Sequence, residues 1–328
     1  MEYDVLKAKY KVEIIISTGE VMDFTQYVTA CTWSDPANEV AARASITFAQ
    51  DKTDKGYINL ILKLGTLVFI YANGQEVFRG VLWDWDYHCT GGQGKSTNII
   101  AYDRMIYAVQ SKDNTYLSPG MSTGDIVNTI CGRWGIPVNY QWENHTHAKI
   151  VYKNKAISEQ VLEILEDAAR KKEKKYVAYM EKDSLQIKHR GTNRDVYYFN
   201  ADNTISTRDK LSMSKLVTKV IILGKEDKEG RFPVEGTVTG DLRFGTLQEV
   251  VYRDGDFSLG DAAAEANEVL RQRGKPDEVI QIKAPDVPFL RKGDRIKVHA
   301  GNLYQTTLYI KGITHDMVNR TMTMECER

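Results

Sequence analysis

The sequence predicts a mainly β protein in which two related antiparallel β-barrels flank a small α+β middle domain. Two observations carry this prediction. A segment of three consecutive strand patterns, residues 64–103, is echoed near the C-terminus at 292–327. Between the two copies the apolar period changes from two to about 3.6, which indicates helices. We therefore expect three domains, at residues 1–112, 113–208 and 209–328.

The first barrel begins with four strand patterns between residues 9 and 50. In the last of them Ala44, Ile46 and Phe48 alternate with other residues, as in a strand with one buried face. The three strands of residues 64–103 follow, and Asn73-Gly74 is a strong hairpin signal between the first two. Six or seven short strands separated by turn residues are typical of a closed or nearly closed barrel.

The C-terminal copy repeats the order of the special residues. The first copy has Gly65, Asn73-Gly74, Gly80 and Asp84, and the second has Gly293, Gly301-Asn302, Gly312 and Asp316. Each aspartate lies four residues beyond its glycine. We therefore expect Gly65, Gly80 and Asp84 to correspond to Gly293, Gly312 and Asp316, so that the two barrels superpose strand for strand.

An aromatic ladder follows Gly80. If the strand is regular, Trp83, Trp85, Tyr87 and Cys89 share one face, opposite Leu82 and its alternate neighbours. The ladder is interpreted as barrel core, and the alternative is a subunit interface, where aromatic residues are enriched.

The middle domain is expected to contain two helices and a hairpin. Ser122 or Thr123 caps the first helix, whose apolar stripe ends in Trp134, and Ser158 caps the second. A basic run at 170–175 suits the C-terminal end of that second helix. A hairpin then turns at residues 181–183.

The second barrel is expected to resume with strands at 216–223 and 249–253 and to carry an inserted helix. Asp261 is its expected cap, and Gly274 and Pro276 end it. The first barrel has no such helix.

Composition excludes several classes of function. Lysine plus arginine and aspartate plus glutamate each number 44, so no net charge attracts nucleic acid or an anionic membrane. No apolar run approaches the roughly 18 residues of a membrane span, and the charged N-terminus lacks a signal-peptide core, so synthesis in the cytoplasm is expected. The cysteines are dispersed, and we expect four buried or half-buried thiols without a disulfide.

Motifs for catalysis or cofactor binding are weak. Gly94-Lys95-Ser96 resembles the end of a phosphate-binding loop, but a strand pattern follows it where a helix is required. His145 and His147 are two potential zinc ligands with no third at a telling spacing, so a polar loop is the simpler interpretation. The residues therefore predict no enzyme, no cofactor and no metal, but a protein built for contacts.

The sequence also resembles the XkdQ/YqbQ group of contractile-tail hub proteins. The resemblance is carried by AYDRMIYAVQSKDNTYL at 101–117, Gly120 and Thr123, the helix ending in Gly135-Ile136-Pro137-Val138, and GDRIKV through THDMVNRTMTME near the C-terminus. Tyr102-Asp103-Arg104 at the exit of the first barrel is its most specific motif. These three residues either tie the strand end to the middle domain or contact a partner.

The resemblance implies a structural baseplate hub of a contractile phage tail or phage-tail-like particle, assembled in the bacterial cytoplasm. It implies a homotrimer that joins a hexameric tail tube to a trimeric central spike, with other baseplate proteins, including a LysM-type hub adaptor, as further partners. The alternatives are a cell-wall-degrading tail enzyme and a carbohydrate-binding adhesin module. The resemblance is compatible with a virion, a defective prophage and a bacteriocin alike.

Overall fold

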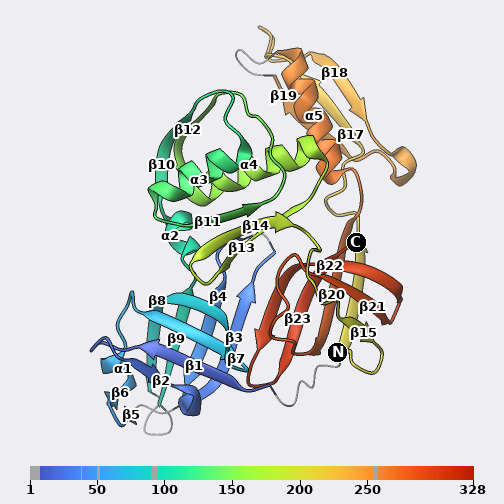
Figure 1. The fold of residues 1–328 in the computed structure, drawn as a ribbon. Coiled ribbons are helices and arrows are strands. Elements are labelled where there is room, and N and C mark those ends of the chain that lie inside the picture. Colours follow the sequence, from blue (N-terminus) through green and yellow to red (C-terminus); the bar gives the residue numbers. More distant parts are fainter. Residues whose placement is uncertain (1–7, 38, 50–51, 90–94, 254–257) are drawn as a thin grey trace. The chain divides into compact units, whose positions relative to one another are not determined.

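The computed structural model describes residues 8–37, 39–49, 52–89, 95–253 and 258–328. The chain divides into two compact units, Met1–Thr207 with Gln281–Arg328, and Arg208–Ile280. It is mostly β, with large antiparallel sheets and few helices, which confirms the expected fold class (Figure 1).

The N-terminal strands, which we call module 1, fold around one core. In sheet order they are β3 (Val28–Asp35), β4 (Arg43–Phe48), β9 (Lys95–Tyr102), β8 (Gln75–Cys89), β7 (Leu67–Ala72), β1 (Tyr10–Ile15) and β2 (Val21–Asp23). Val12, Trp33, Ile46, Ile70 and Ile99, from five of these strands, are all fully buried in the same cluster. The sheet therefore curls so that one face closes on itself. Short elements complete the module: η2 (Thr25–Tyr27), β5 (Lys52–Thr53), β6 (Gly56–Tyr57) and α1 (Ile58–Ile61).

The C-terminal strands, module 2, repeat this order. They are β16 (Ser206–Ser212), β20 (Asp277–Pro285), β23 (Thr321–Glu327), β22 (Leu303–Asp316) and β21 (Arg295–Ala300), with β15 (Tyr198–Asn200) beside β21. β22 also pairs with β3, from Ile313↔Asp35 to Asp316↔Thr32. This seam between β22 and β3 joins the two modules into one sheet.

Backbone pairing shows how the two copies correspond. Leu67↔Val81 in the first meander matches Arg295↔Tyr309 in the second, and Val68↔Gly80 matches Ile296↔Leu308. The first two strands of the copies thus correspond at a constant difference of 228 residue numbers. Gly65 and Gly293 correspond as expected, with φ of +85° and +89°.

The other two expected correspondences are wrong. Gly80 corresponds to Leu308, and Gly312 corresponds to Asp84. Each copy carries a β-bulge at the same place, with Trp83 the extra residue in β8 and Lys311 the extra residue in β22. An alignment of the copies by their second glycines is therefore out of register by four residues. The modules are related strand for strand, but in the register set by the bulge.

Gly312 has a local reason to be glycine. A Cβ atom there would lie 2.6 Å from the backbone nitrogen of Ala37, which is closer than real Cβ contacts. The loop that follows β3 therefore covers the bulge of β22. At the corresponding position of β8, Asp84 is exposed.

The middle domain packs two long helices against strands. Its elements are α2 (Met105–Gln110), β10 (Lys112–Leu117), α3 (Thr123–Arg133), β11 (Val138–Gln141), β12 (Ile150–Ala156), α4 (Ile157–Lys172), β13 (Tyr176–Glu181) and β14 (Ser184–His189). Ser122 caps α3 as expected, through its hydroxyl and the N–H of Asp125. Ser158 does not cap α4: the cap is Ala156, and Ser158 is buried inside the first turn. Trp134 is 37% exposed beyond the end of α3, so it does not continue the apolar stripe.

The second unit is not a helix inserted into a barrel. β17 (Lys219–Leu223), β18 (Val234–Thr239) and β19 (Gln248–Tyr252) form a separate three-stranded sheet with α5 (Leu259–Arg273), and η3 is Leu242–Phe244. Ser258 rather than Asp261 caps α5, and Asp261 completes a capping box from the third position. The segments 216–223 and 249–253, expected in the second barrel, therefore belong to this unit. The domain limits 1–112, 113–208 and 209–328 stay a prediction.

Candidate functional site

The most elaborate polar site is a junction of three parts of the first unit, centred on Arg291. Its guanidinium donates to Asp35 Oδ2 at 2.8 Å, to the Val77 carbonyl at 3.2 Å and to the Met180 carbonyl at 3.0 Å. It also lies 5.0 Å from the ring centre of Tyr179. Arg291, in the segment before β21, thus contacts both module 1 and the middle domain. Its partner Asp35 is 2% exposed, so the ion pair is buried. We call this group the Arg291 junction.

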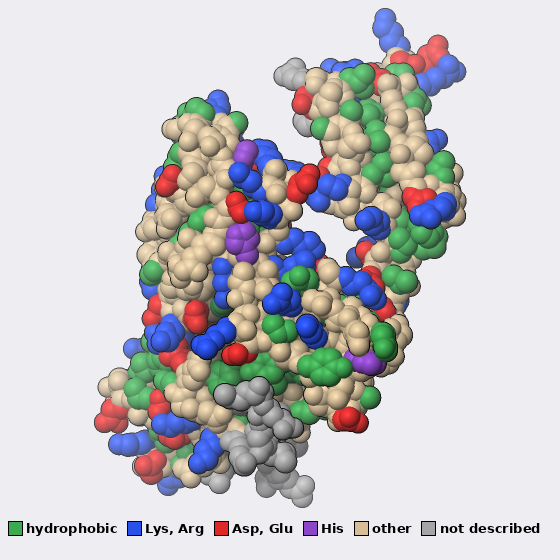
Figure 2. All heavy atoms as spheres, turned by 45° about the vertical axis from the view of Figure 1, so that its right-hand side comes forward, with side chains coloured by type: hydrophobic (Ala, Val, Ile, Leu, Met, Phe, Trp, Pro, Cys, Tyr) green, Lys and Arg blue, Asp and Glu red, His purple; other side chains and the backbone are tan. Residues whose placement is uncertain are grey.

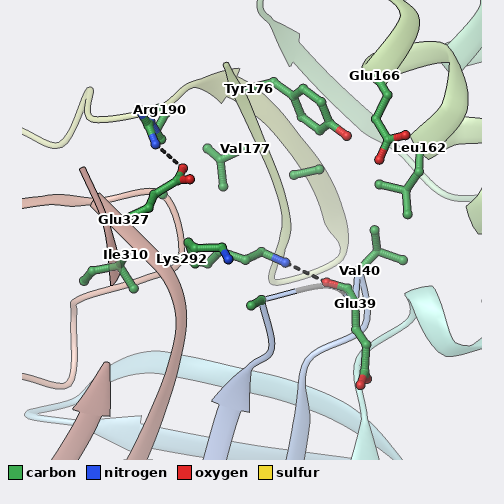
Figure 3. Close-up of a pocket in the computed structure, with 14 residues that line it drawn as sticks. Glu39, Val40, Leu162, Glu166, Tyr176, Val177, Arg190, Lys292, Ile310 and Glu327 are labelled. Atoms are coloured by element: carbon green, nitrogen blue, oxygen red, sulfur yellow. Dashed lines mark hydrogen bonds and ion pairs between the residues drawn. The ribbon is translucent and has the colours of Figure 1, made fainter. Parts of the chain in front are cut away.

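Lys292 extends the junction to the loop that follows β3. Its Nζ donates to the Glu39 carbonyl at 2.7 Å and lies 3.4 Å from the Pro36 carbonyl. Burial lowers the pKa of Lys292, and nearby Asp35 and Asp103 oppose that shift. The lysine stem borders a cavity of about 280 Å³, where Glu327 pairs with Arg190 (Figure 3). Arg190 follows β14 and Glu327 ends β23, so this ion pair ties the middle domain to module 2.

A second buried group stacks beneath the junction. The ring of His315 on β22 lies parallel to that of Trp33 on β3, with centres 4.1 Å apart. His315 Nδ1 is 2.6 Å from Asp286 Oδ1, and its Nε2 is 3.1 Å from the Leu290 carbonyl. This pair therefore locks the β22–β3 seam from the core side.

Asp103 has a structural position. It is 2% exposed, and its two carboxylate oxygens accept from the N–H groups of Ala42 at 2.7 Å and Met105 at 2.8 Å. Burial raises the pKa of Asp103 to about 7, although both hydrogen bonds oppose the rise. Asp103 ties the end of β9 to the loop before β4 and to the start of α2. Arg104 is the N-cap residue of α2, and its guanidinium approaches Gly135, beyond the C-terminal end of α3.

The exposed part of the predicted site is an aromatic patch. Trp83 makes edge contacts with Tyr102, at 6.3 Å between ring centres, and with Tyr107, at 5.8 Å. Trp83 is 37% exposed and Tyr107 is 43% exposed. The structure thus brings Trp83 and Tyr102 together and adds Tyr107, which the sequence reasoning missed. Aromatic residues on α2 at the strand exit were the available signal.

The expected aromatic ladder, with Trp85 and Leu82 on opposite faces of the strand, is wrong. Trp85 packs against the module 1 core and Leu82 is buried in that same core, so these two share a face. The bulge at Trp83 reverses the alternation between them and leaves Trp83 outside the core. Cys89 is exposed, contrary to expectation, whereas Cys31, Cys131 and Cys326 are buried.

The other sequence candidates have local partners. His147 lies in the loop between β11 and β12, as expected, but its side chain is buried: it is 2% exposed, with Nε2 3.0 Å from Thr123 Oγ1 and Nδ1 3.2 Å from Asp167 Oδ2. Gly94 lies outside the described residues, and Lys95 begins β9. Across the described part of the chain, no group of three or more His, Cys, Asp or Glu side chains is placed to hold a metal ion. No helix in those same residues is long and apolar enough to cross a membrane.

Sequence reasoning missed the Arg291 junction entirely. Arg291 and Lys292 precede Gly293 in a stretch that reads as an exposed turn. No local pattern reveals that Asp35, 256 positions away, will pair with Arg291.

Over the face shown in Figure 2, Lys and Arg side chains are interspersed with Asp and Glu.

The fold is that of phage-tail proteins. The structure is similar to the 43 kDa tail protein of prophage MuSo2 from Shewanella oneidensis, with 13% identity and a TM-score of 0.74 over 98% of each chain. It is similar to a tail protein from Neisseria meningitidis MC58, with 12% identity and a TM-score of 0.69 over 97% of this chain and 95% of that one. A third similar structure is the E. coli c3393 protein, a component of the type VI secretion system that is structurally similar to T4 tail proteins gp27 and gp5. It is 11% identical, with a TM-score of 0.58, over 97% of this chain and 76% of that one.

Within this class the family is defined by sequence. The family model of YqbQ-like proteins matches residues 31–327, and the chain belongs to that family. The resemblance expected from Tyr102-Asp103-Arg104 and the C-terminal motif is thereby confirmed. The search of curated proteins found no match.

Proposed function

We propose that the chain is a structural component of a phage tail or phage-tail-like particle, and specifically its baseplate hub. In this role three copies form a ring that joins a hexameric tail tube to a trimeric central spike. The tail proteins that share the fold support the coarser role. Other baseplate proteins, including a LysM-type hub adaptor, are further proposed partners.

The observation that carries the hub role is the internal repeat. The two meanders share strand order, register and bulge position, so each chain offers two similar modules. Three chains then present six modules to a sixfold tube while keeping threefold symmetry toward a spike. Closed rotational rings are the usual solution for such assemblies.

The Arg291 junction suits the same role. In the proposed role the chain contacts several neighbouring proteins at once, so its parts have to keep fixed positions. Buried contacts from Arg291 to Asp35, Val77 and Met180 hold module 1, the middle domain and the segment before β21 together.

A cryo-electron microscopy reconstruction of the assembled particle tests the proposal. We expect three copies of this chain between tube and spike, with both modules facing the tube. A location elsewhere in the tail, or a copy number other than three per baseplate, would refute the hub role. Turnover of purified peptidoglycan, abolished by replacing one carboxylate, would favour the cell-wall-degrading alternative. Saturable glycan binding without trimers would favour the adhesin.

A further inference from the structure

The edge of β8 beyond its bulge is paired along one side only in the described part of the chain. β7 pairs with β8 as far as Leu67↔Val81, and the Leu82 N–H donates to the Thr66 carbonyl. From there to Tyr87, β9 is the one strand that pairs with β8 among the described residues. Residues 83–87, which we call the β8 edge, therefore present one row of backbone groups to a further strand.

The corresponding segment of β22 has a strand on both sides. The difference of 228 equates Trp85, Asp86 and Tyr87 with Ile313, Thr314 and His315. Those three residues pair with β23 on one side and with Asp35, Ser34 and Trp33 of β3 on the other.

Burial reflects this difference in pairing. Ile313 is 2% exposed and His315 is fully buried, because β3 covers them. Trp85 and Tyr87 at the corresponding positions are only half-buried. The β8 edge is therefore uncovered at the positions where β3 covers the corresponding segment of β22.

The repeat also identifies the strand that would complete the β8 edge. The order β3-β4-β9-β8-β7 in module 1 corresponds to β16-β20-β23-β22-β21 in module 2. The counterpart of β3 is therefore β16, which stands at one end of the sheet order among the described residues. Its residue Leu211 is 70% exposed, and an edge strand of this kind is a template for pairing.

We propose that the β8 edge of one chain pairs antiparallel with β16 of a second copy of this chain. This inference rests on the proposed hub role and names the contact that closes the ring. Within each chain a continuous path runs from β16 through β20, β23, β22, β3, β4 and β9 to β8. Its two ends are the two strands proposed to meet, so three copies close a ring in which within-chain and between-chain seams alternate.

Charge favours this partner. The β8 edge carries Asp84 and Asp86 and no cation, and both aspartates are exposed. β16 carries Arg208 and Lys210, both exposed, with Asp209 between them. Opposite net charges on the two strands promote encounter between copies and disfavour pairing of two β8 edges.

Disulfide trapping tests the pairing. Directly opposed residues of antiparallel strands have Cα atoms about 4.5–5.5 Å apart, which a disulfide can bridge. In a Cys89→Ser background, Asp86→Cys is combined in turn with Thr207→Cys, Arg208→Cys and Asp209→Cys. We expect at least one combination to form linked dimers and trimers on oxidation, whereas Asp86→Cys alone does not. Absence of linkage in all three combinations up to the solubility limit, or equal linkage with Asp86→Cys alone, overturns the inference.

A charge swap provides a second measurement that needs no cysteine. Asp84→Lys/Asp86→Lys should weaken self-association at least about tenfold by sedimentation, and adding Arg208→Glu/Lys210→Glu should restore it. The matched control is Asp54→Lys/Glu265→Lys, two exposed acids away from both strands, which should leave association unchanged. Unchanged association in the first variant would contradict the pairing. A baseplate reconstruction that shows the chain in the hub without β8 beside β16 would refute this inference and leave the proposed function standing.

Discussion

Replacing Arg291 with methionine tests whether the junction holds the first unit together. Methionine keeps an unbranched apolar stem but removes every donor. The substitution leaves Asp35, which is 2% exposed, without its ion-pair partner. It also removes the donors to the carbonyls of Val77 and Met180.

The expected cost follows from that geometry. Removing one partner of a buried ion pair costs about 3–5 kcal/mol, because the remaining charge stays buried and uncompensated. For a unit of this size each 1 kcal/mol lowers the melting temperature by about 2–4 °C, so a decrease of about 6–20 °C is expected. Trp33 lies 5.1 Å from the guanidinium, so its fluorescence should report the same transition.

Thermal unfolding followed by circular dichroism and tryptophan fluorescence measures the effect. Adding Asp35→Asn to Arg291→Met should recover part of the loss, because the uncompensated charge is then gone. Arg243→Met breaks an exposed ion pair with Asp241 in the second unit and should leave the transition of the first unit in place. A melting temperature for Arg291→Met within about 2 °C of the parent protein, on the scale above, would refute the reasoning.

Three further predictions follow from single positions. Burial raises the pKa of Asp103 from 3.8 to about 7, so the stability that its protonated form contributes is full below about pH 3.8 and is lost as the pH rises through about 7. The parent should therefore lose more melting temperature between pH 6 and pH 8 than Asp103→Asn, and equal losses would contradict this. Gly293→Ala should destabilise more than Gly65→Ala in urea titrations, because both have positive φ but only at Gly293 would a Cβ atom meet another side chain, 2.6 Å away; equal midpoints would show that the clash relaxes. Trp85→Ala should lower the melting temperature, whereas Trp83→Ala should leave it nearly unchanged and weaken self-association. A larger loss of melting temperature for Trp83→Ala than for Trp85→Ala would show that Trp83 belongs to the core.

Local signals determined a large part of the fold. Asn73 and Gly74 form the expected hairpin turn, with φ of +51° and +78°, because few residues accept those angles. Ser122 caps α3 because its hydroxyl satisfies a free N–H of the first turn. The internal repeat can also be recognised in the sequence, because turns require particular residues and strands show apolar alternation.

Tertiary structure decided the register, the burial of charges and the second unit. Glycine spacing could not reveal the bulges at Trp83 and Lys311, because a bulge is fixed by how two strands pair and has no local composition. One inserted residue reverses which side chains face the core, so strict alternation places the aromatic ladder on the wrong face. The pairing of Arg291 with Asp35 depends on segments 256 positions apart, which only the packed chain brings together.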